Sequence, residues 1–265
     1  MGQKPRFSII TPIHCWNDYR LEGIKRAAES VEKQTFKDFE WIVVNDGSTV
    51  EFPVPKWAKV INKVHEERVA AFNAGLKEAK GEIFCFLDSD DEYEPNYLER
   101  VDSFFRQYKE KIFNFGARYI NQDGSEWLRG AFKPRRRKVG HVTFGGGTIV
   151  NGTFAFHRDV YKDMGGFPPT LVKDIDCSDL HYSEGPRELS MMTPYDFSAY
   201  AQMQYPEIRK FFMVDHEAEP RWKIIKELGN PWGNDYYLFY KYTRKYHSKV
   251  IDEPLYIVHS KVGIQ

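Results

Sequence analysis

Four carboxylate side chains follow directly after a run of apolar residues in the first half of the chain. The apolar run covers residues 83–87, and the carboxylates belong to Asp88, Asp90, Asp91 and Glu92. A short apolar run of this kind predicts a strand that is buried on both faces. Carboxylates so close together repel one another, and a hard divalent cation, which prefers oxygen ligands, would relieve that repulsion. The spacing therefore indicates a site for Mg²⁺ or Mn²⁺, with a solvated acidic turn before a helix as the alternative.

Within this acidic turn, Asp90 is the first candidate for a direct metal ligand and Asp88 is the second. Ser89 between them is small enough to let the backbone approach a ligand, or it is only a spacer. Asp91 and Glu92 are expected to point toward the helix that follows.

A second carboxylate, that of Asp46, also follows an apolar run, at residues 39–44. In open α/β sheets, ligands bind just beyond the carboxyl ends of the strands, so Asp46 and Asp88 are expected to flank one nucleotide. A carboxylate at this place accepts the imide N–H of uracil or the N–H groups of guanine. The alternative is an ordinary turn aspartate before Gly47.

The elements that must position these residues alternate along the first 90 residues. Strands are expected at residues 6–11, where Pro12 stops the strand, and at 39–44, 60–64 and 83–87. A helix capped by Asn17 or Asp18 and a second helix at residues 69–79 lie between them. Strands joined by single helices imply right-handed crossovers and a parallel sheet. Because neither G-x-G-x-x-G nor G-x-x-x-x-G-K-[ST] occurs, the sequence argues against dinucleotide binding and P-loop chemistry.

The composition is that of a protein without a strong overall charge. The chain has 265 residues, with 38 Lys and Arg against 38 Asp and Glu, so nothing points to nucleic acid as a partner. No apolar run approaches the roughly 20 residues of a transmembrane segment, and we expect a cytoplasmic protein. The basic run at residues 133–138 is either a solvated loop or one that attracts phosphate. In the second case Arg135–Arg137 would make peripheral contact with the cytoplasmic face of a membrane.

Several motifs, in this order and at this spacing, resemble those of family 2 glycosyltransferases. Residues 8–13 look like the opening strand, residues 43–49 like the second-strand signature, and Asp88-Ser89-Asp90 like the DxD motif. Residues 70–75 are similar to the next helix motif, although many members carry Arg where Phe72 stands. Residues 154–161, Gly165-Gly166-Phe167 and 231–238 resemble later segments, so the resemblance covers most of the chain except roughly residues 168–230.

The resemblance implies a GT-A type α/β fold, a Rossmann-like mixed sheet flanked by helices. Residues 1–120 would form the nucleotide-sugar-binding half, and residues 121–265 the acceptor-binding half with a helical insert at 168–231. The implied activity is metal-dependent, inverting transfer of a hexosyl or N-acetylhexosaminyl group from a nucleoside diphosphate sugar. UDP is the first expectation for the nucleotide and GDP the second, and the acceptor is a hydroxyl of a glycan, a lipid-linked sugar or a protein.

The same resemblance assigns roles to individual residues. Asp235 would be the catalytic base, although Asn234 stands where the family usually has the first acid of a pair. The alternative for Asp235 is a helix N-cap, with Asp196 or Asp215 as the next candidates for the base. His259 would join Asp88 and Asp90 at the metal, or is only a surface residue. The residues expected to bind the nucleotide sugar are Thr11, Pro12, Asp46, Asn73, Asp88 and Ser89.

The acceptor side is the part that the motifs describe least. Asn151 and Thr153 are candidates for acceptor contacts. The aromatic residues of the insert either stack on sugar rings or pack a small lobe; they are Tyr182, Tyr195, Tyr200, Tyr205 and Trp222. A sugar-1-phosphate nucleotidyltransferase is a second enzyme class, but residues 11–15 lack its glycine-rich loop after the first strand. A degenerate carbohydrate-binding protein is a third reading, against which the intact DxD motif and Asp235 argue.

Overall fold

The protein was examined as a computed structural model, which describes residues 4–66, 68–131, 135–137, 141–143, 150–167, 234–243 and 245–259. The insert expected at residues 168–231 lies outside these residues, and so do its aromatic side chains, Asp196 and Asp215. No helix within the described ranges is long and apolar enough to span a membrane.

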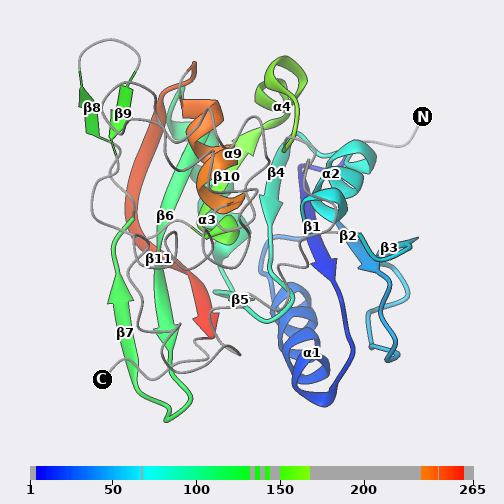
Figure 1. The fold of residues 1–265 in the computed structure, drawn as a ribbon. Helices are drawn as coiled ribbons and strands as arrows, with labels where there is room; N and C mark the ends of the chain where they lie inside the picture. Colours follow the sequence, from blue (N-terminus) through cyan, green and yellow to red (C-terminus); the bar gives the residue numbers. More distant parts are fainter. Residues whose placement is uncertain are drawn as a thin grey trace, which may run out of the picture.

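A nine-stranded mixed sheet forms the centre of the described residues (Figure 1). Its strand order is β3-β2-β1-β4-β10-β6-β11-β5, and β7 pairs with β6 outside this order. The first four of these strands are mutually parallel, whereas β10 runs antiparallel to both of its neighbours. The strands are β1 (Phe7–Ile13), β2 (Phe39–Asp46), β3 (Lys59–Lys63), β4 (Ile83–Phe86), β5 (Glu92–Tyr93), β6 (Ile112–Ile120), β7 (Glu126–Arg129), β10 (Phe154–His157) and β11 (Ser248–His259).

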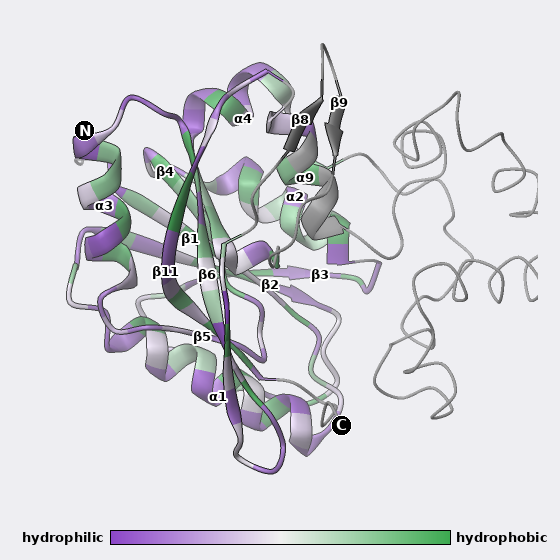
Figure 2. Cartoon of the chain, turned by 90° about the vertical axis from the view of Figure 1, so that its left-hand side faces the viewer, coloured by the Kyte–Doolittle hydropathy of each residue, from purple (hydrophilic) through white to green (hydrophobic). Residues whose placement is uncertain are grey.

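Helices cover both faces of this sheet. On one face, α1 (Asp18–Glu32) and α3 (Tyr97–Gln107) share a large apolar core with the strands. On the other face, the helices α2 (Arg68–Glu78), α4 (Arg158–Met164) and α9 (Asn234–Thr243) pack around a cluster of aromatic residues. Figures 1 and 2 show the sheet between these two helical layers. Every residue of β1 and β4 is buried as a result, which explains the continuous apolar sequence of β4 and confirms the predicted α/β class.

The first helix follows its sequence signals. Asn17 is the N-cap, and its side-chain oxygen accepts the Arg20 N–H at 2.9 Å. Ile24, Ala28 and Val31 are buried against the sheet, as the apolar spacing along residues 18–32 predicts.

Two proline positions differ from the sequence prediction. β1 continues through Pro12 to Ile13, and Pro12 pairs with Val44 of β2. The ladder to β4 ends at Ile10, so β1 has a neighbour on one side only from Thr11 onward, where the missing proline N–H is tolerated. The sequence around Pro254 predicts two closing strands, at residues 250–252 and 255–259, whereas the structure has one strand, β11, because register shifts on both sides of Pro254 absorb the irregularity.

The basic run at residues 133–138 is not simply a loop. Arg135–Arg137 form strand β8, which pairs antiparallel with β9 (His141–Thr143) in a separate two-stranded sheet. A phosphate or membrane contact of this strand stays a prediction.

Candidate functional site

The carboxyl ends of the parallel strands bring the two predicted carboxylate sites to one edge of the sheet. Asp46 ends β2, and Asp88 follows shortly after β4. The segment that opens α2 contacts both: the Glu66 N–H donates to Asp46 Oδ1 at 3.1 Å, and Arg68 Nη2 forms an ion pair with Asp88 Oδ1. Residues 65–68 therefore connect the ends of β2 and β4.

Asp46 contacts two imidazole rings that stack on each other. Nδ1 of His65 is 3.0 Å from Asp46 Oδ2, and Nδ1 of His14 is 2.7 Å from the Asp46 main-chain oxygen. The two rings stack with centroids 4.1 Å apart, and Trp16 lies 4.8 Å from His14. The sequence analysis missed these three aromatic residues. Their position in the segments that immediately follow β1 and β3 was the signal that could have identified them.

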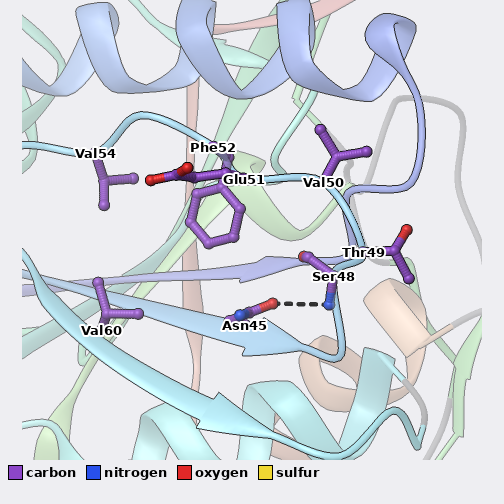
Figure 3. A pocket seen from close by; sticks show the side chains of 8 residues that line it. All are labelled: Asn45, Ser48, Thr49, Val50, Glu51, Phe52, Val54 and Val60. Carbon is purple, nitrogen blue, oxygen red and sulfur yellow. Dashed lines mark hydrogen bonds between the residues drawn. The ribbon is translucent and has the colours of Figure 1, made fainter.

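A pocket of about 300 Å³ borders Asn45, the residue before Asp46 in β2 (Figure 3). Asn45 and Val60 line it, together with residues of the loop 48–54. Side chains alternate between the faces of a strand, so Asn45 faces α1 with Val43, whereas Asp46 faces α2 with Val44. Asn45 Oδ1 accepts the Ser48 N–H at 3.0 Å and so shapes the turn at Gly47. The pocket is therefore separate from the Asp46 carboxylate.

The acidic turn after β4 receives cationic side chains from two helices. Arg20 Nη1 of α1 lies 3.2 Å from Asp90 Oδ2, and Arg68 of α2 pairs with Asp88. Gly23 lets α1 approach closely, because a Cβ at that position would lie 3.0 Å from Asp90 Cα. Asp88 and Asp90 thus each have a guanidinium partner.

Burial and mutual repulsion act strongly on this turn. Burial raises the pKa of the Asp88 carboxyl, Arg68 opposes that shift, and the Asp90 charge adds to it. Burial also raises the pKa of Asp91 well above its ordinary value, and the charges of Asp90 and Asp88 reinforce the effect. A bound cation would counter this repulsion.

Asp91 and Glu92 do not point toward α3, so this expectation was wrong. Asp91 Oδ1 accepts the His259 N–H at 3.0 Å, and Glu92 Oε1 lies 2.6 Å from His259 Nε2. The hydrogen bond from His259 lowers the pKa of Glu92 despite its partial burial. The physical reason is the antiparallel pairing of β5 with β11, which carries both acids to the end of the last strand.

The donor atoms of this turn suit a hard divalent cation, but no complete metal site is formed by the described residues. No three His, Cys, Asp or Glu side chains among them are grouped so that they could hold a metal ion. Asp88 and Asp90 offer carboxylate oxygens, which Mg²⁺ and Mn²⁺ prefer. The ring of His259 forms a hydrogen bond with Glu92. A metal at Asp88 and Asp90 stays a prediction, and it would compete with their guanidinium partners.

Buried tyrosines form hydrogen bonds to the backbone of the acidic turn and of the neighbouring Gly152. The Asp88 N–H donates to Tyr256 Oη at 3.1 Å, and Tyr97 Oη donates to the Gly152 carbonyl at 3.2 Å. Gly152 lies flat against the Tyr256 ring, where an added Cβ would be 1.8 Å from Cε2. The neighbouring Asn151 is fully buried, and its carboxamide has no hydrogen-bond partner among the described residues. A contact of Asn151 with the acceptor stays a prediction.

The other expected nucleotide-sugar contacts near β1 and β4 are largely enclosed. Thr11 is buried, and its hydroxyl accepts the Trp41 Nε1–H at 2.9 Å. Pro12 is buried within β1, and Ser89 is half-buried between Asp88 and Asp90. Thr153, a candidate for the acceptor, closes a local turn by donating to the Val150 carbonyl at 2.8 Å.

Asn73 is engaged by the chain segment after α4. Its Nδ2 donates to the Phe167 carbonyl at 3.0 Å, and its Oδ1 accepts the Phe167 N–H at 2.9 Å. Both ends of the carboxamide therefore anchor the Gly165-Gly166-Phe167 segment, and a contact with a nucleotide sugar stays a prediction.

Asp235 occupies the second position of α9, so the helix start predicted there is confirmed. The described part of the chain does not include its side chain. The helix itself is tied to the segment after α4, because Tyr242 Oη donates to the Gly165 carbonyl at 2.8 Å and Lys241 Nζ to the Gly166 carbonyl at 2.6 Å.

Comparison with known proteins identifies relatives of this chain. A family model described as glycosyl transferase family 2 matches residues 8–165, more than half of the chain. The putative glycosyltransferase EpsH of Bacillus subtilis is 34% identical over 107 residues, which are 37% of this chain and 30% of EpsH. An uncharacterised glycosyltransferase of Rickettsia typhi is 38% identical over 125 residues, 44% of this chain and 38% of the relative. The match thus spans well under half the length of these relatives.

Solved structures of TarS from S. aureus, residues 1–349, are also similar. The structure in complex with UDP-GlcNAc gives a TM-score of 0.49 at 18% identity, covering 85% of this chain and 72% of that chain. The structure in complex with UDP gives a TM-score of 0.48 at 21% identity, covering 64% of this chain and 52% of that chain.

Proposed function

This chain belongs to glycosyl transferase family 2, and we propose that it moves a sugar from a nucleoside diphosphate sugar to an acceptor hydroxyl with inversion. The observation that carries the proposal is the link between Asp46 and Asp88 through residues 65–68 at one sheet edge. Open α/β sheets bind nucleotides at this place. UDP is the first choice of nucleotide and GDP the second, and the group transferred is a hexosyl or N-acetylhexosaminyl group.

The base of the nucleotide is assigned to the Asp46 end. An ionised carboxylate has about four lone-pair sites, so Asp46 can accept a base N–H beside its bonds to Glu66 and His65. The rings of His14, His65 and Trp16 offer an aromatic surface on which a base can stack.

The diphosphate is assigned to the acidic turn, where Asp88 and Asp90 would hold Mg²⁺ or Mn²⁺. When bound, such a cation would neutralise the negative charge that develops on the leaving diphosphate. Tyr256 and Gly152 hold the backbone of the turn in place for this task. His259 adds a hydrogen bond to Glu92 at the same turn.

Asp235 is assigned the proton transfer. Its carboxylate takes the proton of the acceptor hydroxyl, whose oxygen attacks the anomeric carbon opposite the leaving group. The bond between that carbon and the diphosphate oxygen breaks, and its electron pair leaves with the nucleoside diphosphate. The acceptor is a hydroxyl of a glycan, a lipid-linked sugar or a protein.

The experiment is a thermal-shift screen of nucleoside diphosphates and their sugars, with and without Mn²⁺, followed by donor hydrolysis. A ligand at a hundred times its dissociation constant stabilises by about 2.7 kcal/mol, which the screen detects. Asp235→Asn should keep donor binding and lose roughly 10²- to 10⁴-fold in turnover. Near-normal turnover of this variant would exclude Asp235 as the base, and a product of retained configuration would exclude single displacement. Failure of every nucleotide to stabilise the protein would reject the donor assignment.

A further inference from the structure

We propose that Arg68 is a diphosphate-binding residue of the donor site, whose guanidinium exchanges the Asp88 carboxylate for the phosphates of the bound nucleotide. This inference rests on the proposed function and names a residue that supplies part of its specificity for diphosphates. The evidence is the position of Arg68 between the two ends of the site, its ion pair and its exposure.

Arg68 lies where the phosphates would lie if Asp46 contacts the base. The Glu66 N–H, two residues earlier, is bonded to Asp46, and the Arg68 side chain reaches Asp88. A nucleotide that spans these two aspartates passes the first turn of α2. The Arg68 guanidinium therefore lies where it can contact the middle of such a ligand.

The packing of α2 aims the guanidinium at this place. Phe72, one turn later on the helix, is completely buried and packs against Phe86 at 4.8 Å and Phe167 at 5.3 Å. The Arg68 guanidinium carbon lies 5.4 Å from the centroid of the Phe72 ring. Residues four apart on a helix are neighbours, so the ring supports the arginine side chain along its length.

Exposure distinguishes Arg68 from the second arginine of the acidic turn. The Arg68 side chain is 44% exposed, whereas that of Arg20 is 10% exposed and covered by Trp16 at 4.6 Å. Arg20 is thus confined beside Asp90. Arg68 can turn from one anion to another without opening the core.

The exchange follows from competition between anions for one guanidinium. A planar guanidinium binds phosphate through two parallel charge-assisted hydrogen bonds, as it binds a carboxylate. A cation held by Asp88 would leave the Arg68 guanidinium available to the phosphates of the arriving diphosphate. Before that, the ion pair shields the buried carboxylate of Asp88.

The test measures binding by calorimetry with UDP, GDP, uridine, guanosine and inorganic pyrophosphate as probes, each with and without Mn²⁺. Arg68→Ala should weaken the binding of UDP or GDP, and the binding of pyrophosphate, by about 10- to 100-fold. This is the range expected when hydrogen bonds to a charged group are lost. The nucleosides should bind as they do to the wild type. Arg68→Lys, which keeps the charge without the planar fork, should fall between the two.

Arg100→Ala is the matched control. Arg100 also lies in the first turns of its helix, pairs with a carboxylate (Glu253, 2.6 Å) and lies over a phenylalanine four residues later (Phe104, 4.9 Å). Its side chain is 38% exposed. This variant should leave all five affinities unchanged.

A second pair of variants tests whether the affinity for pyrophosphate rises when the competing carboxylate is removed. Asp88→Asn removes the anion that competes for Arg68, so pyrophosphate without metal should bind more tightly than to the wild type. Adding Arg68→Ala to Asp88→Asn should cancel that gain. No gain in Asp88→Asn would contradict the exchange.

The outcomes separate this inference from the proposed function. Wild-type binding of UDP or GDP that persists unchanged in Arg68→Ala would overturn the role of Arg68 alone. An equal loss of affinity for nucleosides and for nucleotides would show that Arg68 is only a structural partner of Asp88. If the wild type binds neither UDP nor GDP, the donor assignment falls, and the inference falls with it.

Discussion

Replacing Asn73 with alanine tests whether this residue is an anchor of the fold or a contact for the donor. The wild-type carboxamide makes two hydrogen bonds to the backbone of Phe167, at 2.9 Å and 3.0 Å. Gly166 packs directly on it, because a Cβ on Gly166 would lie 2.3 Å from Asn73 Oδ1. Phe167 in turn is buried in the aromatic cluster beneath α2. Among the described residues, no other side chain forms a hydrogen bond to the Phe167 backbone, so the variant removes both of these bonds.

The expected cost follows from the two backbone groups that lose their partners. A desolvated polar group without a hydrogen bond costs about 1–3 kcal/mol, so the pair costs about 2–4 kcal/mol once some water enters. For a chain of this size, each kcal/mol lowers the Tm by roughly 2–4 °C, which gives a drop of roughly 4–16 °C.

Thermal unfolding and nucleotide titration of the same samples provide the measurement. Asn62→Ala is the control, because Asn62 makes a single exposed hydrogen bond to Asn45 and should change stability by less than about 0.5 kcal/mol. We expect Asn73→Ala to lose stability and to retain its affinity for UDP or GDP at low temperature. An unchanged Tm with weakened nucleotide binding would refute this reasoning and make Asn73 a ligand contact.

Two further predictions address the ends of β2 and β4. Asp46→Ala should weaken UDP or GDP binding both with and without Mn²⁺, as measured by calorimetry; an unaltered affinity with a lower Tm would make Asp46 a structural partner of Glu66 and His65. Gly152→Ala should lower the free energy of unfolding by about 1–3 kcal/mol through the clash with Tyr256, as measured by thermal unfolding; a melting temperature equal to that of the wild type would argue against the Tyr256 contact.

Much of the fold could be predicted because local patterns determine which elements form. The strands predicted at residues 39–44 and 83–87 became β2 and β4, since the apolar residues 41–44 and 83–87 suit strands that are covered on both faces. The Asn17 cap and the apolar spacing after it determined α1. Parallel order then brings Asp46 and Asp88 to one edge, which follows from connectivity alone.

Only the tertiary structure decided which groups meet at that edge. Tyr256 supports Asp88 across 168 residues of sequence, and Asn73 bonds to Phe167 across 94, distances over which no periodicity carries information. Asp91 and Glu92 face His259 rather than α3 because the short strand β5 pairs with β11, a pairing set by the register of the whole sheet. Arg68 shows the same division: the sequence by itself determined its helix, but its ion pair with Asp88 exists because α2 packs across the ends of β1 and β2. Residue types and local spacing determine the elements, whereas the partners of each charged side chain depend on how distant elements pack.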